Sequence, residues 1–322
     1  MDKMQLTFVN VGYGEAILIE CPDETCAGGV FTALIDGGGA EMSEYVGATG
    51  RIPLADYLAQ RGVGHIDLAV STHIHEDHLS GMLPALRRTP PRTFWHTLPH
   101  DLWRGMMPLD PALAQCLSAR KFRQALEDYH TLCGELPDAG CTLTTVRAGE
   151  RIPLCAGLTA HILAPSSARE RMLEERLRAL YTEPDTAKLD QADVSMNNFS
   201  IVVLLEYGDT RILLPGDTNA AGYHDIDSAL RAHLFKLGHH GQRDSVTPAL
   251  LDKIAPAHTV CCASSDRRYD SADPALLRDL AARGIECWFS DCPPRFDGTT
   301  PPPHHALTFT IGMHGDITGH YA

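Results

Sequence analysis

The chain has 322 residues, 44% of them hydrophobic, and a formal net charge of −14. This composition suits a globular core, and the acidic balance argues against broad, non-specific binding of nucleic acid, which needs a basic surface. No apolar stretch approaches the roughly 20 residues that span a bilayer, and the first residues are typical of a strand, so we expect a cytoplasmic protein without membrane contact.

The first ninety residues are rich in predicted strands. Short apolar runs at 6–9, 16–19 and 31–35 are separated by Gly, Asn and Pro turns. A helix is expected at 53–60, with Pro53 near its first turn. A continuous apolar strand at 65–71 and a helix at 79–88 follow.

The middle of the chain has a weaker pattern. Residues 91–108 are typical of a loop, 111–133 have apolar residues near helical spacing, and a strand at 158–163 precedes a charged helix at 167–181. A polar stretch then ends near Asn197. We expect a single domain, 1–322, with a variable helical and loop insertion around 89–192. His96, His100 and His130 lie in this segment and are expected at surface or loop positions.

The last third alternates between strands and helices. Runs at 201–206 and 211–214 predict a hairpin around Tyr207-Gly208-Asp209. Further strands are expected at 234–237, 259–263, 286–289 and 305–311, with a helix at 274–283. This order favours two packed sheets with outer helices.

Residues 72–78 read THIHEDH and directly follow the strand expected at 65–71. His73 and His75 are two residues apart in extended backbone, so both rings point to the same side, and Asp77 and His78 follow at the turn. Four ligands packed this closely cannot all serve one tetrahedral ion that also keeps a position for substrate. The arrangement predicts two metal ions, with His73 and His75 on one and Asp77 and His78 on the other. These nitrogen and oxygen ligands favour zinc, with manganese or iron as alternatives.

Two later strands also end in candidate ligands. Asp217 follows the strand at 211–214 within LLPGDT, and His239 and His240 follow the strand at 234–237 within KLGHHG. Sites of α/β proteins usually lie at the C-terminal ends of strands. Three strands that each deliver His or Asp at this end predict one shared metal site.

The motifs THIHEDH, PGDT and LGHHGQ resemble the metallo-β-lactamase superfamily, whose hallmark is H-x-H-x-D-H. FVNVGYGEAILIE with ALIDGG, and NNFSIVVLLEYGDTRILLPGDT, resemble the opening strands and central hairpin of its ComEC-like subgroup, the hydrolase domain of a competence DNA-uptake protein and its stand-alone relatives. The resemblance covers residues 5 to about 277 and is weakest at 89–192. It implies an αββα sandwich of two mixed β-sheets flanked by helices. It also implies that Asp217 bridges two divalent metal ions and that the GHHG motif supplies one ligand, either His239 or His240.

The chain departs from the superfamily pattern at two places. Many members carry a histidine before the central hairpin, whereas this chain, like the ComEC-like subgroup, has Asn and Ser in the stretch 197–200, which leaves one metal with fewer ligands. Relatives often have Tyr-x-His-Pro where this chain has Tyr269 to Pro274. Asp270 or Asp273 is the alternative ligand there, although Asp273 before Pro274 is also typical of a helix N-cap. Asp36 is a candidate partner for a ligating histidine, and the glycines at 37–39 predict close backbone packing beneath the site.

These residues predict a metallo-hydrolase. A metal pair lowers the pKa of bound water to about 7 and so supplies hydroxide at neutral pH. Asp77 is the candidate to orient that water, and His240, or His239 if His240 is only a ligand, is the candidate proton donor. The resemblance to the ComEC-like subgroup implies a phosphodiester substrate, either a small nucleotide or a locally gripped nucleic acid, and Arg267 and Arg268 are the candidate phosphate partners. The alternatives are hydrolysis of a lactone, thioester or amide, and a non-catalytic metal-binding interaction protein.

Overall fold

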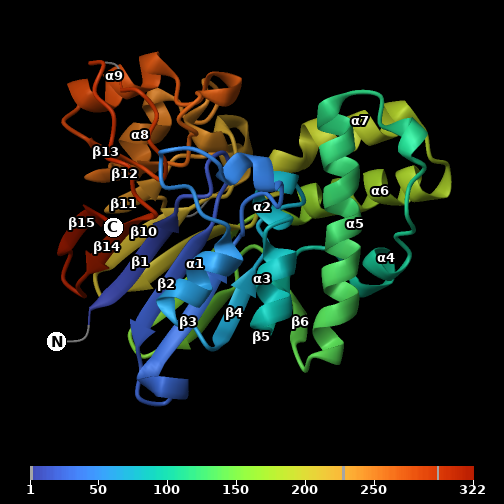
Figure 1. Ribbon diagram of the computed structural model, residues 1–322, viewed down its shortest axis with the longest axis horizontal. Helices are drawn as coiled ribbons and strands as arrows, with labels where there is room; N and C mark the ends of the chain where they lie inside the picture. Colours follow the sequence, from blue (N-terminus) through green and yellow to red (C-terminus); the bar gives the residue numbers. More distant parts are fainter. Residues whose placement is uncertain (1–2, 227–228, 296) are drawn as a thin grey trace.

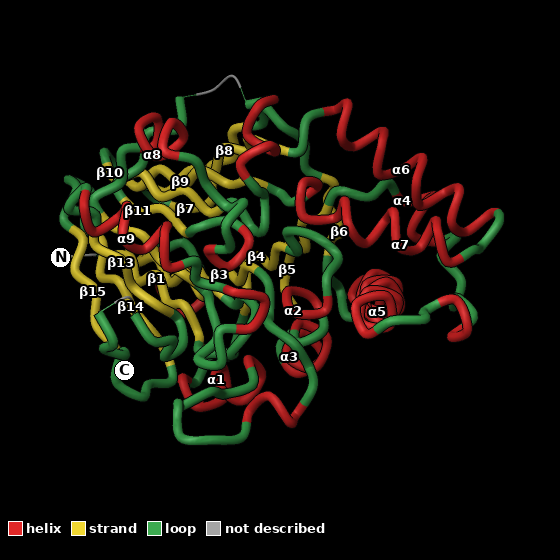
Figure 2. The backbone as a smooth tube through the Cα atoms, turned by 90° about the horizontal axis from the view of Figure 1, so that it is seen from above, coloured by secondary structure: helices red, strands yellow, loops and turns green. Residues whose placement is uncertain are grey.

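The computed structural model describes residues 3–226, 229–295 and 297–322. They form two mixed β-sheets with helices on the outer faces (Figures 1 and 2). The first sheet contains, in spatial order, β15 (Ile317–Tyr321), β14 (Ala306–Ile311), β1 (Met4–Val9), β2 (Ile17–Pro22), β3 (Val30–Ile35), β4 (Ile66–Val70), β5 (Pro91–His96) and β6 (Thr142–Thr145). The second contains β13 (Glu286–Phe289), β12 (His258–Cys261), β11 (Leu234–Lys236), β10 (Thr210–Leu214), β9 (Val202–Tyr207), β8 (Leu158–Ala164) and β7 (Arg151–Cys155).

Each sheet changes from antiparallel to parallel pairing along its width. In the first sheet β3, β4, β5 and β6 are parallel, and in the second sheet β10, β11, β12 and β13 are parallel. The predicted hairpin is confirmed, because β9 and β10 pair antiparallel around a turn in which Gly208 has a φ of 59°. Parallel strands place their carboxyl ends at a common edge, and the chain segments that follow β3, β4, β10 and β11 therefore share one region.

The helices cover the outer faces of the two sheets. They are α1 (Leu54–Arg61), α2 (Glu76–Leu79), α3 (Met82–Arg88), α4 (His100–Arg104), α5 (Leu117–Asp138), α6 (Ser167–Thr182), α7 (Thr186–Ser195), α8 (Pro248–Ile254) and α9 (Pro274–Ala282). Helix α5 buries residues such as Phe122, Leu126 and Tyr129, whose spacing of three or four residues forms one apolar stripe. Figure 1 shows α4 to α7 on one side of the sheets, beyond β5 and β6.

Three apolar cores correspond to the layers. The first sheet packs on the second through side chains such as Phe8 and Leu68 against Leu205 and Ile212. A second core joins the outer face of the first sheet to α1, α3, α5, α6 and α7, and a third joins the outer face of the second sheet to α8 and α9. The αββα sandwich expected from the sequence is therefore confirmed.

One part of the secondary-structure prediction was wrong, and a second stretch contains a helix that was not predicted. Residues 91–108 are not a loop, because they contain β5 and α4. Pro91 occupies the first position of β5, where a missing N–H disrupts little pairing, and Phe94 and Trp95 are buried. The polar stretch before Asn197 contains α7, whose first turn is capped by the Asp185 carboxylate. The segment expected as an insertion thus contributes β5 to β8 as well as α4 to α7, and the single-domain reading stays a prediction.

The helix expected at 79–88 begins later, as α3 at Met82, because Leu79 ends α2 and Ser80 and Gly81 separate the two helices. A Cβ on Gly81 would lie 2.0 Å from the carbonyl oxygen of Gly37, so this crossing of two backbones requires glycine. Within the described residues, no helix is both long and apolar enough to cross a membrane.

His96 is not a surface histidine, contrary to the expectation. It ends β5, is 2% exposed, and its Nδ1 lies 2.6 Å from the Tyr129 hydroxyl. His100, at the start of α4, is exposed, and His130 is partly exposed. Burial, with a small contribution from His100, lowers the pKa of His96 to about 4.

This shift predicts a specific pH dependence of stability. The unfolded chain takes up the His96 proton near pH 6.5, whereas the folded chain does so only near pH 4. The contribution of neutral His96 is therefore present above pH 6.5 and is lost as the pH falls towards 4, by about 3 kcal/mol at most. Urea unfolding of wild type and His96→Phe across this range measures it. The difference in stability between the two proteins should shift in favour of the variant as the pH falls; a constant difference would contradict the assignment.

Candidate metal centre

Four chain segments bring polar side chains to the common edge of the two sheets. Asp36 follows β3 and THIHEDH follows β4 in the first sheet. Asp217 follows β10, and the GHHG motif follows β11, in the second sheet. The site therefore lies where the carboxyl ends of strands from both sheets meet.

Glycines allow these segments to approach one another. A Cβ on Gly14 would lie 2.3 Å from the carbonyl oxygen of Asp77, and a Cβ on Gly238 would lie 2.1 Å from that of Thr218. His239 and His240 adopt left-handed φ angles of 44° and 51°, which non-glycine residues rarely do. Such backbone conformations cluster at functional sites, where surrounding structure maintains them.

Asp77, His78, Asp217 and His240 form a compact cluster whose ligand atoms all lie within 4.8 Å of one another. The Asp217 Oδ2 atom is 2.9 Å from His240 Nε2 and 3.3 Å from His78 Nε2. Asp77 Oδ2 is 3.0 Å from His240 Nε2. Three of the four side chains are buried and Asp77 is partly exposed, so the cluster is closed on one side and open on the other.

Hydrogen bonds on the far side of each ring fix which nitrogen faces the cluster. His78 Nδ1 donates to the Asp36 carboxylate at 2.7 Å, and His240 Nδ1 donates to the Cys262 carbonyl at 3.0 Å. In the neutral rings both Nε2 atoms therefore carry lone pairs, and they face each other at 3.4 Å beside two carboxylates. This concentration of acceptors fits a divalent cation, and nitrogen with oxygen donors suits zinc.

The pKa shifts in the cluster also favour a bound cation. Burial disfavours charged His78, but the Asp217, Asp36 and Asp77 carboxylates outweigh burial and raise the pKa of His78 well above its usual value. Burial also opposes ionisation of Asp217, yet His240, His78 and Lys236 outweigh it and hold the pKa of Asp217 well below its usual range. The cluster thus favours ionised carboxylates and a positive charge among them.

His73 and His75 form a second pair of facing nitrogens. The Thr72 hydroxyl donates to Asp36 at 2.5 Å and so accepts from His73 Nδ1 at 3.1 Å, which leaves His73 Nε2 with a lone pair. That nitrogen lies 3.1 Å from His75 Nδ1. The His73 and His78 ring centroids are 4.3 Å apart, so the pair adjoins the cluster. The expected division of the ligands between two ions matches this arrangement and stays a prediction.

A buried ion pair supports Asp217 from behind. Lys236, the last residue of β11, is fully buried; its Nζ contacts the Glu15 carboxylate and donates to Gly216 O at 2.8 Å and Asp217 Oδ1 at 3.2 Å. Burial disfavours the charged amine, but Glu15 and Asp217 outweigh it and raise the pKa of Lys236. One oxygen of Asp217 is therefore held by Lys236 while the other faces the two histidines.

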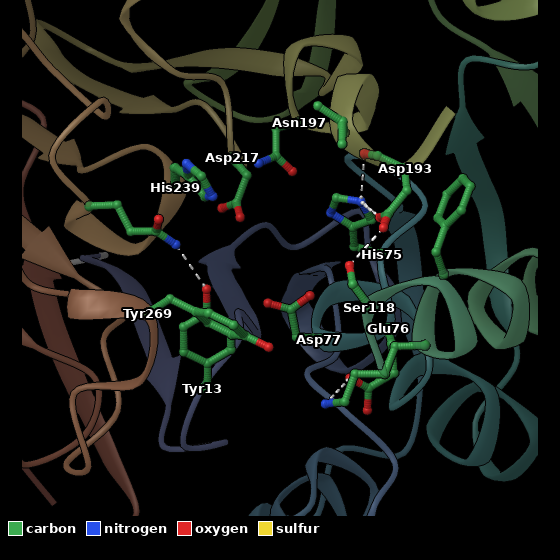
Figure 3. Close-up of a pocket in the computed structure, with 14 residues that line it drawn as sticks. Tyr13, His75, Glu76, Asp77, Ser118, Asp193, Asn197, Asp217, His239 and Tyr269 are labelled. Carbon is green, nitrogen blue, oxygen red and sulfur yellow. Dashed lines mark hydrogen bonds and ion pairs between the residues drawn. The ribbon is translucent and has the colours of Figure 1, made fainter. Parts of the chain in front are cut away.

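A pocket opens over the cluster. Figure 3 shows Asp77 and Asp217 pointing into it, with Tyr13, Tyr269 and His239 on one side and α5 and α7 residues on the other. Its lining residues are Tyr13, His75, Glu76, Asp77, Ser118, Lys121, Phe122, Asp193, Val194, Asn197, Asp217, His239, Gln242 and Tyr269. Tyr13 packs on His240, with ring centroids 4.4 Å apart, and its hydroxyl accepts from Gln242 at 3.2 Å. Burial, together with Asp77 and Asp217, raises the pKa of Tyr13 well above its usual value, so its hydroxyl remains a donor.

No protein-family model matches the chain. Among curated proteins, ComE operon protein 3 of Bacillus subtilis (strain 168) matches at 21% identity over 298 residues. The match covers 89% of this chain and 32% of that protein, so the chain spans about a third of the relative's length. The chain resembles the ComEC-like group. This agrees with the motifs and the sandwich fold.

Solved structures with similar folds have low sequence identity. Zn²⁺-bound PqqB from Methylobacterium extorquens is 12% identical, with 88% of this chain and 97% of that chain covered and a TM-score of 0.44. A diphosphatase of the PhnP family is 14% identical, with 96% and 99% covered and a TM-score of 0.44. CmlA, a diiron β-hydroxylase from Streptomyces venezuelae, is 12% identical, with 96% and 54% covered and a TM-score of 0.48. At these values the likenesses do not bear on the chemistry of this chain.

The two histidines left open by the sequence differ in their surroundings. His240 belongs to the cluster, whereas His239 is not in it; His239 Nδ1 binds Asp244 at 2.9 Å and the side chain lines the pocket. Asp273 caps α9 by accepting from Ala275 N at 3.1 Å, as the N-cap alternative predicted.

The expectation for the two arginines was wrong. Arg268 makes two hydrogen bonds of 2.8 Å to Glu44, and Arg267 donates to the Ala272 carbonyl at 2.9 Å. Neither lines the pocket over the described cluster. Strand β12, which precedes both arginines, does end at the edge of the sheets where the cluster lies. However, the Arg268 side chain is bound to the Glu44 carboxylate and the Arg267 side chain to the Ala272 carbonyl.

Proposed function

We propose that the protein is a metal-dependent hydrolase and that its substrate is a phosphodiester. The observation that carries the first part is the convergence of imidazole Nε2 atoms and two carboxylates at the floor of an open pocket. When bound there, divalent metal ions supply Lewis acidity and lower the pKa of water.

The residues around the floor fit the remaining steps of hydrolysis. Asp77 is the partly exposed carboxylate of the cluster, so it can orient a water and accept its proton. His239 is held at Nδ1 by Asp244, which leaves Nε2 for the substrate. The Tyr13 hydroxyl accepts from Gln242, so its own proton is available to a developing negative charge. The role of proton donor thus passes from His240, which belongs to the cluster, to Tyr13, whereas His239 Nε2 carries a lone pair and can accept a hydrogen bond.

Lys121 replaces Arg267 and Arg268 as the candidate residue that binds the substrate phosphate. Among the described residues that line the pocket, Lys121 is the one lysine or arginine. It lies on α5, and its Nζ is 3.0 Å from Glu76 Oε2. Lys121 and Glu76 both line the pocket, so a phosphate bound there can replace the Glu76 carboxylate as the partner of the Lys121 amine. The resemblance of the motifs to the ComEC-like subgroup, the hydrolase domain of a DNA-uptake protein, also supports a phosphodiester.

A specific observation favours the acyl alternative. The lining carries four carboxylates, from Glu76, Asp77, Asp193 and Asp217, against that one lysine. Bound metal ions neutralise part of this charge, but a neutral lactone or ester needs no further cation. The substrate class is therefore decided by comparing the two chemistries in one set of variants.

The test uses zinc- or manganese-loaded protein with bis-p-nitrophenyl phosphate and a neutral p-nitrophenyl ester. Lys121→Gln should raise KM for the phosphodiester about tenfold, near the lower limit for a charged hydrogen bond because Lys121 is partly exposed, and should leave the neutral ester unchanged. Lys253→Gln, at an exposed position of α8 outside the pocket lining, is the control and should change neither. Turnover of the ester without any turnover of phosphodiesters would reverse the assignment, and equal losses on both substrates would show that Lys121 supports the fold.

A further inference from the structure

Asp193 binds the His75 ring on the side that faces away from the cluster. Its Nε2 lies 3.1 Å from the Asp193 carboxylate and 3.3 Å from the Asp193 carbonyl, as the dashed lines in Figure 3 show. Carboxylate and carbonyl oxygens only accept, so Nε2 carries the proton and Nδ1 carries the lone pair. Nδ1 is the atom that faces His73 Nε2 at 3.1 Å. Contact with Asp193 therefore selects the form of His75 that presents a bare nitrogen to its neighbour.

Asp193 is itself held in place. The Ser118 hydroxyl donates to its other carboxylate oxygen at 2.6 Å, and the Asp193 side chain is 13% exposed. Phe122, one turn after Ser118 on α5, packs edge-on against the His75 ring with centroids 5.7 Å apart. The ring is thus fixed in both position and rotation by one acid, one hydroxyl and one aromatic side chain.

All three of these residues come from helices that lie outside the two sheets. Ser118 and Phe122 belong to α5 and Asp193 belongs to α7, and these helices pack on each other beside the sandwich (Figure 1). The sheet edge alone delivers His75 but does not orient it. Most of the chain from α5 to α7 lies in the range 89–192, where the resemblance to the superfamily is weakest. Helix α7 ends just before Asn197, where many members of the superfamily have a histidine.

We propose that Asp193, held by Ser118, is a positioning residue that completes the His73 and His75 half of the metal centre. Helices α5 and α7 are then part of the centre and not only a wall of the pocket. The inference rests on the metal centre of the proposed function, but it does not depend on the substrate. Removal of a hydrogen-bond partner behind a ligating histidine typically weakens metal binding by about 10- to 100-fold.

The experiment is calorimetric titration of chelator-stripped protein with Zn²⁺. His75→Ala first identifies which of the two binding events belongs to the His73 and His75 half. Asp193→Ala should weaken that event by about 10- to 100-fold and leave the other unchanged. Asp193→Asn, which keeps an acceptor, should recover part of the loss, and Ser118→Ala should have a smaller effect in the same direction. Asp190→Ala, an exposed acid on the same helix, is the matched control.

The outcomes separate the possible failures. Unchanged affinities in Asp193→Ala would overturn the positioning role while leaving the centre intact. Equal weakening of both events together with a lower unfolding temperature would show that Asp193 supports the fold instead. A wild-type protein that binds no divalent metal would overturn the centre and this inference with it, whereas a protein that binds metal but hydrolyses nothing would overturn only the proposed function.

Discussion

Asp217→Ala should reduce bound metal from two equivalents to one or none and lower kcat/KM by about a thousandfold or more, which corresponds to about 4 kcal/mol. Asp217 Oδ2 lies 3.3 Å from His78 Nε2 and 2.9 Å from His240 Nε2, and the resemblance to the superfamily predicts that this carboxylate contacts both cations. A carboxylate in this position offsets the mutual repulsion of two metal ions. Its loss should therefore release the more weakly held ion and misplace the other.

The fold should survive this substitution. Lys236 retains its contacts with Glu15 and Gly216 O when Asp217 is removed. Metal content is measured by elemental analysis after loading with zinc or manganese, and secondary structure by circular dichroism. Asp209→Ala, an exposed acid in the turn before the same strand, is the matched control and should bind two equivalents. Full activity in Asp217→Ala, or only trace metal in the loaded wild type, would show that the PGDT match is accidental.

Most of the cluster could be predicted because its residues follow strands. THIHEDH, Asp217 and His240 each come directly after an apolar run, and the carboxyl ends of parallel strands share an edge. The partner role of Asp36 also followed from its position after β3. Periodicity is a short-range signal, and these residues depend only on where a strand ends.

The residues that sequence reasoning missed depend on long-range packing. Asp193 reaches His75 across 118 positions of the chain, and Arg268 reaches Glu44 across 224. No local pattern specifies such pairs. Pro91 and the polar residues around it concealed β5, although the buried Phe94 and Trp95 were visible in the sequence. Lys236 left a clearer signal, because a lysine within the apolar run of a buried parallel strand must find a partner.

Lys236→Met is expected to destabilise the protein by about 3–5 kcal/mol, because it leaves the buried Glu15 carboxylate without its cation. Removing one member of a buried pair costs more than the pair contributes, since the remaining charge keeps its desolvation penalty. Urea unfolding in the presence of a chelator measures this loss without any contribution from bound metal. Lys253→Met, at an exposed position of α8, is the control and should change stability by less than about 0.5 kcal/mol.

The double variant decides whether the loss comes from the pair. Glu15→Gln removes the carboxylate charge, so Lys236→Met combined with Glu15→Gln should be more stable than Lys236→Met alone, and the coupling free energy should be several times the 0.5 kcal/mol seen between independent sites. Recovery should be incomplete, because Asp217 Oδ1 and Gly216 O still lack their donor. If the double variant is no more stable than Lys236→Met, the lysine acts through its packing in the strand.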